Sequence, residues 1–561
     1  MPTRTRMWEA LGDDSAPWVG DVVVVGGGIT GAGIARDAAR RGLRTVLVEM
    51  GDLASGTSSR SSKLVHGGLR YLEQYEFSLV FEAVSERRIL MDIAPHLVNP
   101  LAFLFPVYKR SRRGLWMINA GMWLYDGLSL FRSPKVHRTL KPGEVAKEEP
   151  ALDGTDLTGA PVYYDCGTDD ARLTLETALD AAVCGAVIAT YTKVVGFLKG
   201  ADGRITGVTV EDVLTGARKE IRANAVINAT GPWTDKTIGM SAASIGGALL
   251  RPTKGVHVVV DRAKLPVQHA VVAIHPKDGR VLFAIPWGDR AYIGTTDTDY
   301  EGDPAEVAAT RADVDYLIEA ARAYFPNHPL THADIVATWA GLRPLMQPPD
   351  AAVSESKVSR EHQITVGADG LVTIAGGKLT TYRRMASEVV DTAVNLLRLG
   401  NHLVARLGSA RTDEEPLPGA VGWPEDDDHD RVAAQIRSAS GDKLTAAQAR
   451  HLADTYGMRG LDLARRVASD PELGTALVEG RPEILGQVDW AVREELATRV
   501  SDVLIRRTQL YYRDVDQGLT AAGAIARRMA SLLGWDDARL ADELAGYERE
   551  VARSRRWRSE G

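Results

Sequence analysis

Three glycines near the N-terminus have the spacing at which a protein backbone can approach a diphosphate. Gly26, Gly28 and Gly31 form a G-x-G-x-x-G pattern. In such a pattern the first glycine permits a tight turn, the second leaves room for a pyrophosphate, and the third allows close contact between a helix and a strand. The spacing therefore predicts a dinucleotide site.

The residues around these glycines predict the βαβ unit that such a site requires. Residues 22–25 are all valine, typical of a buried parallel strand, residues 29–41 predict a helix that Gly42 ends, and residues 45–48 predict the next strand. The helix N-terminus would donate N–H groups to an anion, and a carboxylate after the second strand would accept from ribose hydroxyls. The contacts expected from this unit are Gly26, Gly28, Ile29, Thr30, Gly31 and Glu49.

Three further segments indicate FAD rather than NAD as the dinucleotide. Residues 55–63 (SGTSSRSSK) offer hydroxyl groups to a pyrophosphate and a ribityl chain, and the glycine pair 67–68 would let backbone approach a flat ring. Residues 225–233 (AVINATGPW) and 372–386 (VTIAGGKLTTYRRMA) each predict a buried strand followed by a glycine turn. N–H groups of the last turn could stabilise a reduced flavin. The expected contacts are Thr57, Ser58, Ser59, Ser62, Lys63, Leu64, His66, Gly67, Gly68, Thr230, Gly231, Gly377, Lys378, Leu379 and Thr380, with no metal.

Together with four more stretches, these segments give the chain its resemblance to a known family. The stretches are YDCGTDDARL (164–173), TKGVHVVV (253–260), IPWGDRAYIGTTDTDY (285–300) and GLRPL (341–345). From about residue 21 to residue 385 the chain resembles the FAD-dependent glycerol-3-phosphate dehydrogenases. The resemblance implies oxidation of sn-glycerol 3-phosphate to dihydroxyacetone phosphate on FAD, with electrons passed to a membrane quinone. It also implies a peripheral protein on the cytoplasmic, inner face of the plasma membrane.

The substrate that this resemblance implies is a small dianion, which needs several fixed cations. Arginine is the strongest choice, because its planar fork matches phosphate oxygens. We expect substrate contacts from Arg70, Tyr71, Arg343, Arg360 and Lys378.

Oxidation also requires a group that accepts the proton of the substrate hydroxyl. Histidine suits this role, because its unperturbed pKa is ~6.5. His66 and His257 are the histidines inside the matched motifs, and Tyr71 or a desolvated Lys378 could substitute, with Arg343 helping to stabilise an alkoxide. The sequence leaves the identity of the base open.

The element pattern predicts an α/β fold with three parts. The first is a two-dinucleotide-type, Rossmann-like FAD-binding domain within residues 1–408, assembled from about residues 20–98, 150–245 and 350–400. Alternating patterns such as 256–261 and 290–297 predict an inserted antiparallel β-sheet substrate domain at about 99–149 and 246–349. Residues 409–428 predict a linker, and residues 429–561 an α-helical C-terminal domain that includes a helix within 495–512.

The amino-acid composition limits the partners and the cellular location that we expect. A formal net charge of −7 gives no global attraction to nucleic acid, and the pair Cys166 and Cys184 is too small for a disulfide framework. The N-terminal residues lack a signal-like apolar core, so we expect a cytoplasmic location. Aromatic and basic residues at 99–132 suit peripheral membrane contact, whereas the tail 551–561 predicts disorder. We also expect that two copies of the chain could form a homodimer.

Other readings stay open at this level. An oxidase on the same scaffold would pass electrons to oxygen, and no residue in the sequence decides between the two acceptors. A flavin amine or amino-acid oxidase would need one carboxylate clamp rather than several cations. A non-catalytic scaffold would bind no flavin.

Overall fold

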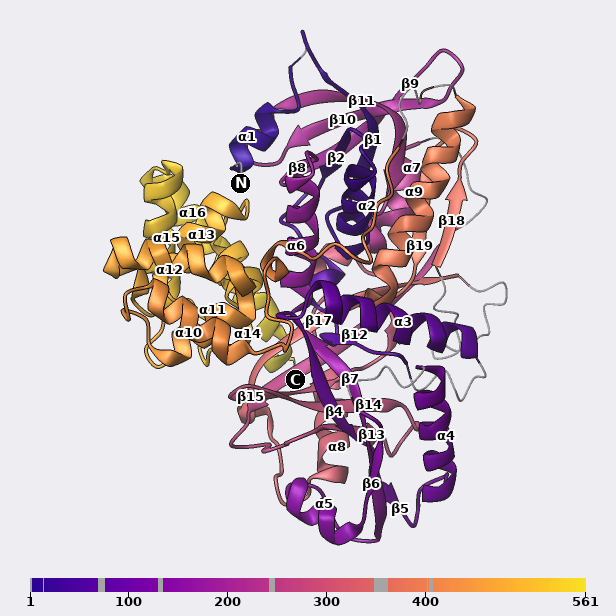
Figure 1. The fold of residues 1–561 in the computed structure, drawn as a ribbon, viewed down its shortest axis with the longest axis vertical. Coiled ribbons are helices and arrows are strands. Elements are labelled where there is room, and N and C mark those ends of the chain that lie inside the picture. The colour runs from indigo at the N-terminus through magenta and orange to yellow at the C-terminus, as the bar shows by residue number, and fades with distance from the viewer. Residues whose placement is uncertain are drawn as a thin grey trace.

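A computed structural model gives the fold of the chain (Figure 1). It describes residues 3–13, 15–68, 76–129, 135–241, 248–347, 362–400, 402 and 407–560.

One sheet is built around the valine-rich strand β1 (Trp18–Val25). β1 pairs in parallel with β11 on one side and β2 on the other, β11 pairs in parallel with β19, and β2 with β8. Antiparallel strands β18, β10 and β9 extend this sheet. The bounds are β2 Thr45–Val48, β8 Val187–Ala189, β9 Thr192–Lys199, β10 Ile205–Asp212, β11 Arg218–Asn228, β18 His362–Val366 and β19 Val372–Gly376.

Helices α2 (Ile29–Arg40), α6 (Asp170–Val183) and α9 (Tyr382–Leu399) pack against this sheet and share one hydrophobic core with it. They stand side by side in the upper part of Figure 1. The predicted helix at 29–41 is confirmed to within one residue. Helices α1 (Arg4–Glu9), α3 (Phe77–Ile93) and α7 (Thr234–Gly239) lie outside this layer.

A second, largely antiparallel sheet fills the lower half of the molecule. Its strand order is β16-β12-β15-β14-β13-β4-β7-β3, and β17 pairs with β12. Helices α4 (Leu115–Leu128), α5 (Pro142–Glu148) and α8 (Arg311–Tyr324) accompany it. The bounds are β3 Leu64–Val65, β4 Val98–Leu104, β5 Val107–Tyr108, β6 Arg138–Leu140, β7 Leu157–Thr168, β12 Leu250–Asp261, β13 Ala270–Ile274, β14 Val281–Trp287, β15 Arg290–Gly294, β16 Thr298–Asp299 and β17 Ile335–Met346.

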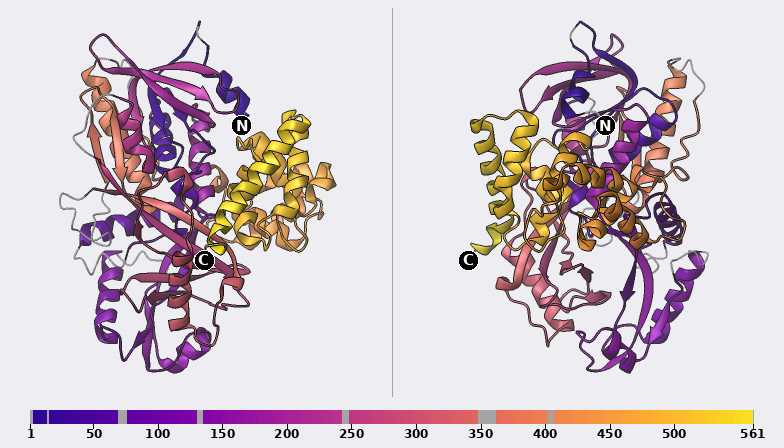
Figure 2. Two further views of the ribbon diagram at one scale, coloured as in Figure 1. Left: turned by 180° about the vertical axis from the view of Figure 1, so that it is seen from behind. Right: turned by 60° about the vertical axis from the view of Figure 1, so that its left-hand side comes forward.

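The C-terminal residues form helices that pack beside both sheets, coloured orange to yellow in Figure 2. Beyond residue 428 the predicted helical character is seen throughout this part. The bounds are α10 His429–Ala439, α11 Ala446–Tyr456, α12 Gly460–Ser469, α13 Leu485–Glu494, α14 Leu510–Arg513, α15 Leu519–Leu533 and α16 Asp537–Arg555. The domain boundaries given above remain a prediction.

Two expectations for this part are wrong. Residues 495–512 do not form one α-helix: they contain a π-helix, Asp502–Arg507, followed by α14, and Gln509 between them has a φ of 58°. Residues 551–560 of the tail are ordered rather than disordered, because α16 runs to Arg555 and Trp557 is only 1% exposed within the core of the second sheet. Arg558 Nη2 also donates to the carbonyl of Ile335 at 2.7 Å.

No helix among the described residues is long and apolar enough to cross a bilayer.

Candidate active site

A cavity of about 920 Å³ is lined by residues from both sheets. The loops that follow β1, β11 and β19 contribute to its wall, as do strands of the second sheet and helix α4. Most of the predicted site residues line it. They are Gly26, Gly28, Ile29, Thr30, Glu49, Thr57, Ser58, Ser62, Leu64, His66, Gly68, Thr230, Gly231, Arg343, Gly377, Lys378, Leu379 and Thr380.

Other predicted residues lie elsewhere. Gly31, Ser59, Lys63, Gly67 and His257 are behind the cavity wall. Arg70, Tyr71 and Arg360 lie outside the described residues.

The glycine turn has the geometry that the motif predicts. Gly26 has a φ of 113°, a conformation that favours glycine, and a Cβ on Gly31 would lie 1.8 Å from the carbonyl oxygen of Gly26. A Cβ on Gly28 would meet only Ser58 Oγ at 3.1 Å, so the space beyond it is open to the cavity. The turn therefore leaves a cradle at the N-terminus of α2.

Glu49 and Ser58 organise the backbone around that cradle. The Glu49 carboxylate accepts from the N–H of Gly27 at 2.6 Å and of Gly51 at 2.8 Å. Burial raises the pKa of Glu49, and these two N–H groups oppose that shift. Ser58 Oγ accepts from the N–H of Ile29 at 2.9 Å. Together they fix the first turn of α2 beside the buried Glu49 carboxylate.

The backbone of His66 is held at the cavity wall by two hydrogen bonds to Thr380. Its backbone N–H donates to Thr380 Oγ1 at 3.1 Å, and Thr380 Oγ1 donates to its carbonyl at 3.2 Å. The next residue, Gly67, donates its N–H to Asp165 Oδ1 at 3.1 Å, and Asp165 forms a buried ion pair with Arg87. The segments around residues 66 and 380, distant in sequence, are therefore fastened together at the wall.

His257 reaches the cavity only through Ser62. Its Nε2 lies 2.9 Å from Ser62 Oγ, and its ring stacks on Trp339 with centroids 4.7 Å apart. Burial lowers the pKa of His257 well below its ordinary value, and the positive charges of Arg343 and Lys63 lower it further. The side chain is therefore neutral at neutral pH.

Arg343 projects from β17 into the cavity with its guanidinium held in place. Nη1 donates to Asp297 Oδ1 at 3.0 Å, and Nη2 donates to Thr295 Oγ1 at 3.2 Å. Thr295 and Asp297 line the cavity because β15 ends at Gly294, not at residue 297 as the pattern suggested. The guanidinium is thus a cation of fixed position.

Several cations of the cavity wall were missed by sequence reasoning. Arg280 lies in the turn before β14, donates to the carbonyl of Asp297 and so lies near Arg343. A cation at the tip of a hairpin carries no signal of its own in the sequence. The others are Lys193 and Lys236, with Arg112 and Arg113, which the sequence assigned to membrane contact.

Comparisons with known proteins agree with this arrangement. Residues 21–383 match the model of the FAD dependent oxidoreductase family, and residues 410–540 match the C-terminal domain of alpha-glycerophosphate oxidase. Glycerol-3-phosphate dehydrogenase 2 of Mycobacterium tuberculosis is 42% identical over 98% of this chain and 90% of its own length. The aerobic glycerol-3-phosphate dehydrogenase of Staphylococcus haemolyticus is 38% identical over 92% of this chain and 91% of its own.

The chain belongs to the FAD-dependent glycerol-3-phosphate dehydrogenase family. A solved structure leads to the same family: the glycerol-3-phosphate dehydrogenase of Bacillus halodurans, complexed with FAD, has a TM-score of 0.79 at 33% identity. The alignment covers 99% of this chain and 98% of that one. The predicted fold class, resemblance and FAD cofactor are therefore confirmed.

The cavity fits FAD on its own geometry. The cradle at Gly28 would be filled by any larger side chain, Glu49 stands next to it, and the glycine pair 376–377 has φ values of 76° and 90° that bring backbone to the wall. Thr57 and Thr230 line the same cavity, so the residues that would hold FAD come from the βαβ unit and from all three further segments that the sequence singled out.

We predict that Gly28→Val abolishes FAD retention. The γ-methyl groups would occupy the space into which a pyrophosphate must fit, because beyond Ser58 Oγ a Cβ meets no protein atom. The measurement is the flavin-to-protein absorbance ratio after gel filtration. Gly196→Val on β9 is the matched control, because a Cβ there has no neighbour within 4 Å, and it should keep its flavin. Equal flavin content in the two variants would contradict the assignment.

Proposed function

We propose that this protein oxidises sn-glycerol 3-phosphate to dihydroxyacetone phosphate. The observation that carries the proposal is that a cradle for FAD and fixed cations line one cavity. Relatives 38–42% identical to the chain carry the name glycerol-3-phosphate dehydrogenase. When bound, FAD supplies the acceptor for the hydride that leaves substrate C2.

In this proposal Arg343 and Lys378 bind the phosphate group. A guanidinium matches two phosphate oxygens at once, and Arg343 is already oriented by Asp297 and Thr295. Asp297 offsets part of the positive charge, so a dianion also needs further cations, and Lys378 and Arg280 line the same cavity. Arg70, Tyr71 and Arg360 stay in the proposal on the resemblance alone.

We propose that His66, rather than His257, is the base that accepts the proton of the substrate hydroxyl. His66 belongs to the cavity wall, whereas His257 stands behind Ser62 and holds its hydroxyl. A base must come within hydrogen-bond reach of the proton that it removes. His257 then acts as a positioning residue for Ser62.

The decisive experiment is an anaerobic spectrum of the purified holoenzyme before and after addition of glycerol 3-phosphate. The flavin band should bleach with glycerol 3-phosphate but not with glycerol or an amino acid, because neither of those carries the phosphate. Arg343→Ala should keep its flavin and raise the substrate concentration for half-maximal bleaching, at least about tenfold for the loss of a charged hydrogen-bonding partner.

The matched control is Arg218→Ala, which removes the same charge from a side chain 66% exposed on β11. Its bleaching curve should equal that of the wild type. Bleaching by an amino acid would favour the amino-acid oxidase reading, and a flavin-loaded protein that no substrate bleaches would contradict the proposal.

His66→Asn tests the base. The rate of flavin reduction at saturating substrate should fall by about 10²–10⁴-fold, the usual contribution of general base catalysis. The remaining rate should also lose the decline at low pH that protonation of a histidine base causes. His257→Asn should reduce the rate less, and a larger loss in His257→Asn than in His66→Asn would move the role of base to His257.

For the electron acceptor we propose a membrane quinone. One part of the cavity wall is apolar, beyond what a small phosphate ester needs, and it is formed by α4 with strands β4, β13 and β14. Its residues include Phe103, Phe105, Ile118, Met122, Val272 and Phe283. An apolar wall of this kind suits the prenylated ring of a quinone.

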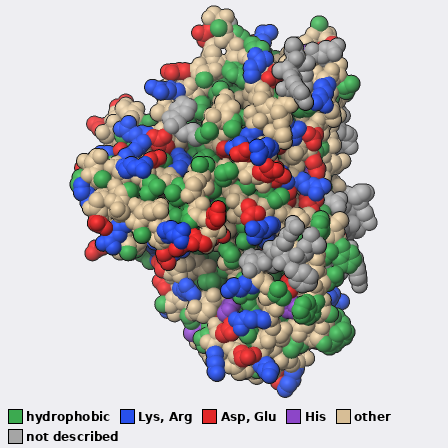
Figure 3. Space-filling view, in the orientation of Figure 1, with side chains coloured by type: hydrophobic (Ala, Val, Ile, Leu, Met, Phe, Trp, Pro, Cys, Tyr) green, Lys and Arg blue, Asp and Glu red, His purple; other side chains and the backbone are tan. Residues whose placement is uncertain are grey.

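The outer face of α4 supports peripheral contact with the inner face of the plasma membrane. Trp116 and Trp123 are 74% and 58% exposed, and hydrophobic side chains gather over α4 in Figure 3. Arg112 and Arg113 precede the helix, and basic residues beside aromatic ones suit an anionic lipid surface. The same helix would thus contact lipid on one side and the cavity on the other.

We predict that Trp116→Ser combined with Trp123→Ser weakens binding to phosphatidylglycerol vesicles and slows reduction of a prenylated quinone held in them. Reduction of a water-soluble dye should be unchanged, because the FAD and substrate contacts remain. Val19→Ser with Val183→Ser removes comparably exposed apolar groups away from α4 and serves as control. Undiminished vesicle binding would contradict the contact, and peroxide formation that matches substrate consumption would favour the oxidase.

A further inference from the structure

The loop between Glu49 and Ser58 supplies part of the FAD cavity, yet its middle is turned away from it. Glu49, Met50 and residues 55–58 line the cavity, whereas Asp52 is 1% exposed and does not. The carbonyl of Asp52 accepts the N–H of Ser55 at 3.1 Å, which closes the turn between the two lining stretches. The position of Asp52 therefore sets the position of both.

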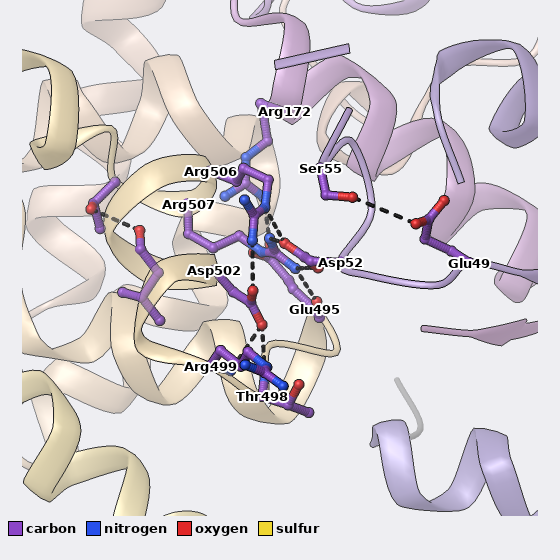
Figure 4. A network of polar contacts seen from close by, with 12 residues as sticks. Glu49, Asp52, Ser55, Arg172, Glu495, Thr498, Arg499, Asp502, Arg506 and Arg507 are labelled. Carbon is purple, nitrogen blue, oxygen red and sulfur yellow. Dashed lines mark hydrogen bonds and ion pairs between the residues drawn. The ribbon is translucent and has the colours of Figure 1, made fainter. Parts of the chain in front are cut away.

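Asp52 is held by the C-terminal helical part, more than 450 residues away in sequence. Its carboxylate accepts from Arg506 Nε at 2.5 Å and from Arg507 Nη1 and Nη2 at 2.6 and 2.9 Å. Figure 4 shows both guanidinium groups directed at Asp52, with Ser55 and Glu49 on the adjacent stretch of loop. One carboxylate thus receives three charge-assisted hydrogen bonds.

The two arginines belong to the buried π-helix Asp502–Arg507 and have further partners there. Arg506 Nη2 donates to Asp502 Oδ1 at 2.6 Å, and Arg507 Nη2 donates to the carbonyl of Glu495 at 2.7 Å. Asp502 also accepts from the hydroxyl of Tyr191 at 2.6 Å. Single-turn π-helices occur often at functional sites, and here two consecutive arginines meet one acceptor.

We propose that the C-terminal helical domain positions the loop between Glu49 and Ser58 through the contact of Asp52 with Arg506 and Arg507. This is the loop that would contact the ribose and pyrophosphate of FAD. These three residues touch neither FAD nor substrate and act as positioning residues. The inference rests on the FAD cofactor, and among its tests only the bleaching comparison uses the substrate proposed above.

The electrostatics of the contact favour this role over a merely adhesive one. Desolvation opposes the charge on Asp52, and the two arginines overcome it, so that the pKa of Asp52 is lowered. Replacing a whole buried ion pair by well-packed apolar groups is often neutral, whereas removing one partner leaves an uncompensated buried charge. The bonds to both guanidinium groups therefore favour the position of the loop in which the Asp52 carboxylate meets them.

The test is the dissociation constant of FAD, measured by flavin fluorescence quenching on titration of apoprotein. Asp52→Asn and Arg507→Gln should each raise it about tenfold or more, the loss that removal of a residue supporting a metal ligand causes, because here too the removed group holds a binding residue in place. At saturating FAD both variants should bleach at the wild-type glycerol 3-phosphate concentration, because no substrate contact has changed.

Asp489→Asn is the matched control for a general loss of stability. Asp489 is 5% exposed, and its carboxylate accepts two bonds from Arg528 at 2.6 and 2.8 Å within the C-terminal helices. This variant should lower the melting temperature and leave the FAD dissociation constant within twofold of wild type. If Asp52→Asn weakens FAD no more than Asp489→Asn does, the proposal is overturned.

Hydrogen exchange on the unmodified protein gives a second test, which decides the matter if the Asp52 variant does not fold. Coupling between two sites is reciprocal, so FAD added to apoprotein should slow exchange at residues 49–58 and also at residues 498–508. Amides of α11 serve as reference for general stabilisation. Slower exchange at 49–58, with 498–508 no more affected than α11, would overturn the proposal.

Discussion

The parallel register of β1, β11 and β19 is the constraint on which the site depends. Val25 of β1 is paired with Asn228 of β11, which is paired in turn with Thr373 of β19. Because parallel strands end at a common edge, the glycine turns that follow them meet there, although they lie about residues 26, 230 and 376 in the sequence. A one-residue slip of any pair would move side chains from one buried face of the sheet to the other, so the packing of the two cores that fixes the register also fixes the cofactor site.

The hydroxyl-rich segment after β2 joins that edge to the second sheet. Its side chains at Thr57, Ser58 and Ser62 line the cavity, while its backbone carbonyls bind the opposite sheet. Ser61 accepts from Trp339 Nε1 at 3.1 Å, and Ser62 accepts from the hydroxyl of Tyr292 at 2.9 Å. The segment therefore connects the two sheets that form opposite sides of the cavity.

Close approach of β17 to this segment requires a glycine as well. A Cβ on Gly341 would lie 2.6 Å from the carbonyl oxygen of Arg60, and Thr57 Oγ1 donates to the carbonyl of Leu342 at 2.7 Å. Arg343 follows on the same strand and reaches the cavity from there. In the "GLRPL" stretch, Gly341 thus allows β17 to approach the hydroxyl-rich segment closely, and Arg343 reaches the cavity from the strand held there.

The sequence predicted those parts of the fold and the site that depend on local pattern. The glycine turn, α2 and the carboxylate Glu49 follow from spacing within about thirty residues, and their geometry agrees with it. Tertiary packing decided the rest. A π-helix occurs in place of the predicted α-helix where Arg506 and Arg507 bind the Asp52 carboxylate, which comes from the N-terminal part of the chain. The tail is ordered as far as residue 560 because Trp557 packs into the core of the second sheet.

Lys63 shows why residue type alone does not tell where a side chain points. In the sequence it closes a run of hydroxyls and is expected to contact the cofactor, whereas in the structure its Nζ donates to Asp170 Oδ1 at 2.6 Å in a buried ion pair. Asp170 also accepts from the N–H and the hydroxyl of Ser61, so the pair supports the hydroxyl segment from behind.

The same buried cation has a consequence for charge at the site. Burial disfavours a second proton on the His257 imidazole and so lowers its pKa, and the positive charges of Arg343 and Lys63 lower that pKa further. His257 therefore adds no positive charge for a substrate phosphate and presents a neutral ring to Ser62. In the function that we propose, the charge that binds the dianion must therefore come from the cations of the cavity wall, and for this reason the proposal gives Arg343, whose guanidinium is fixed by Asp297 and Thr295, the central role.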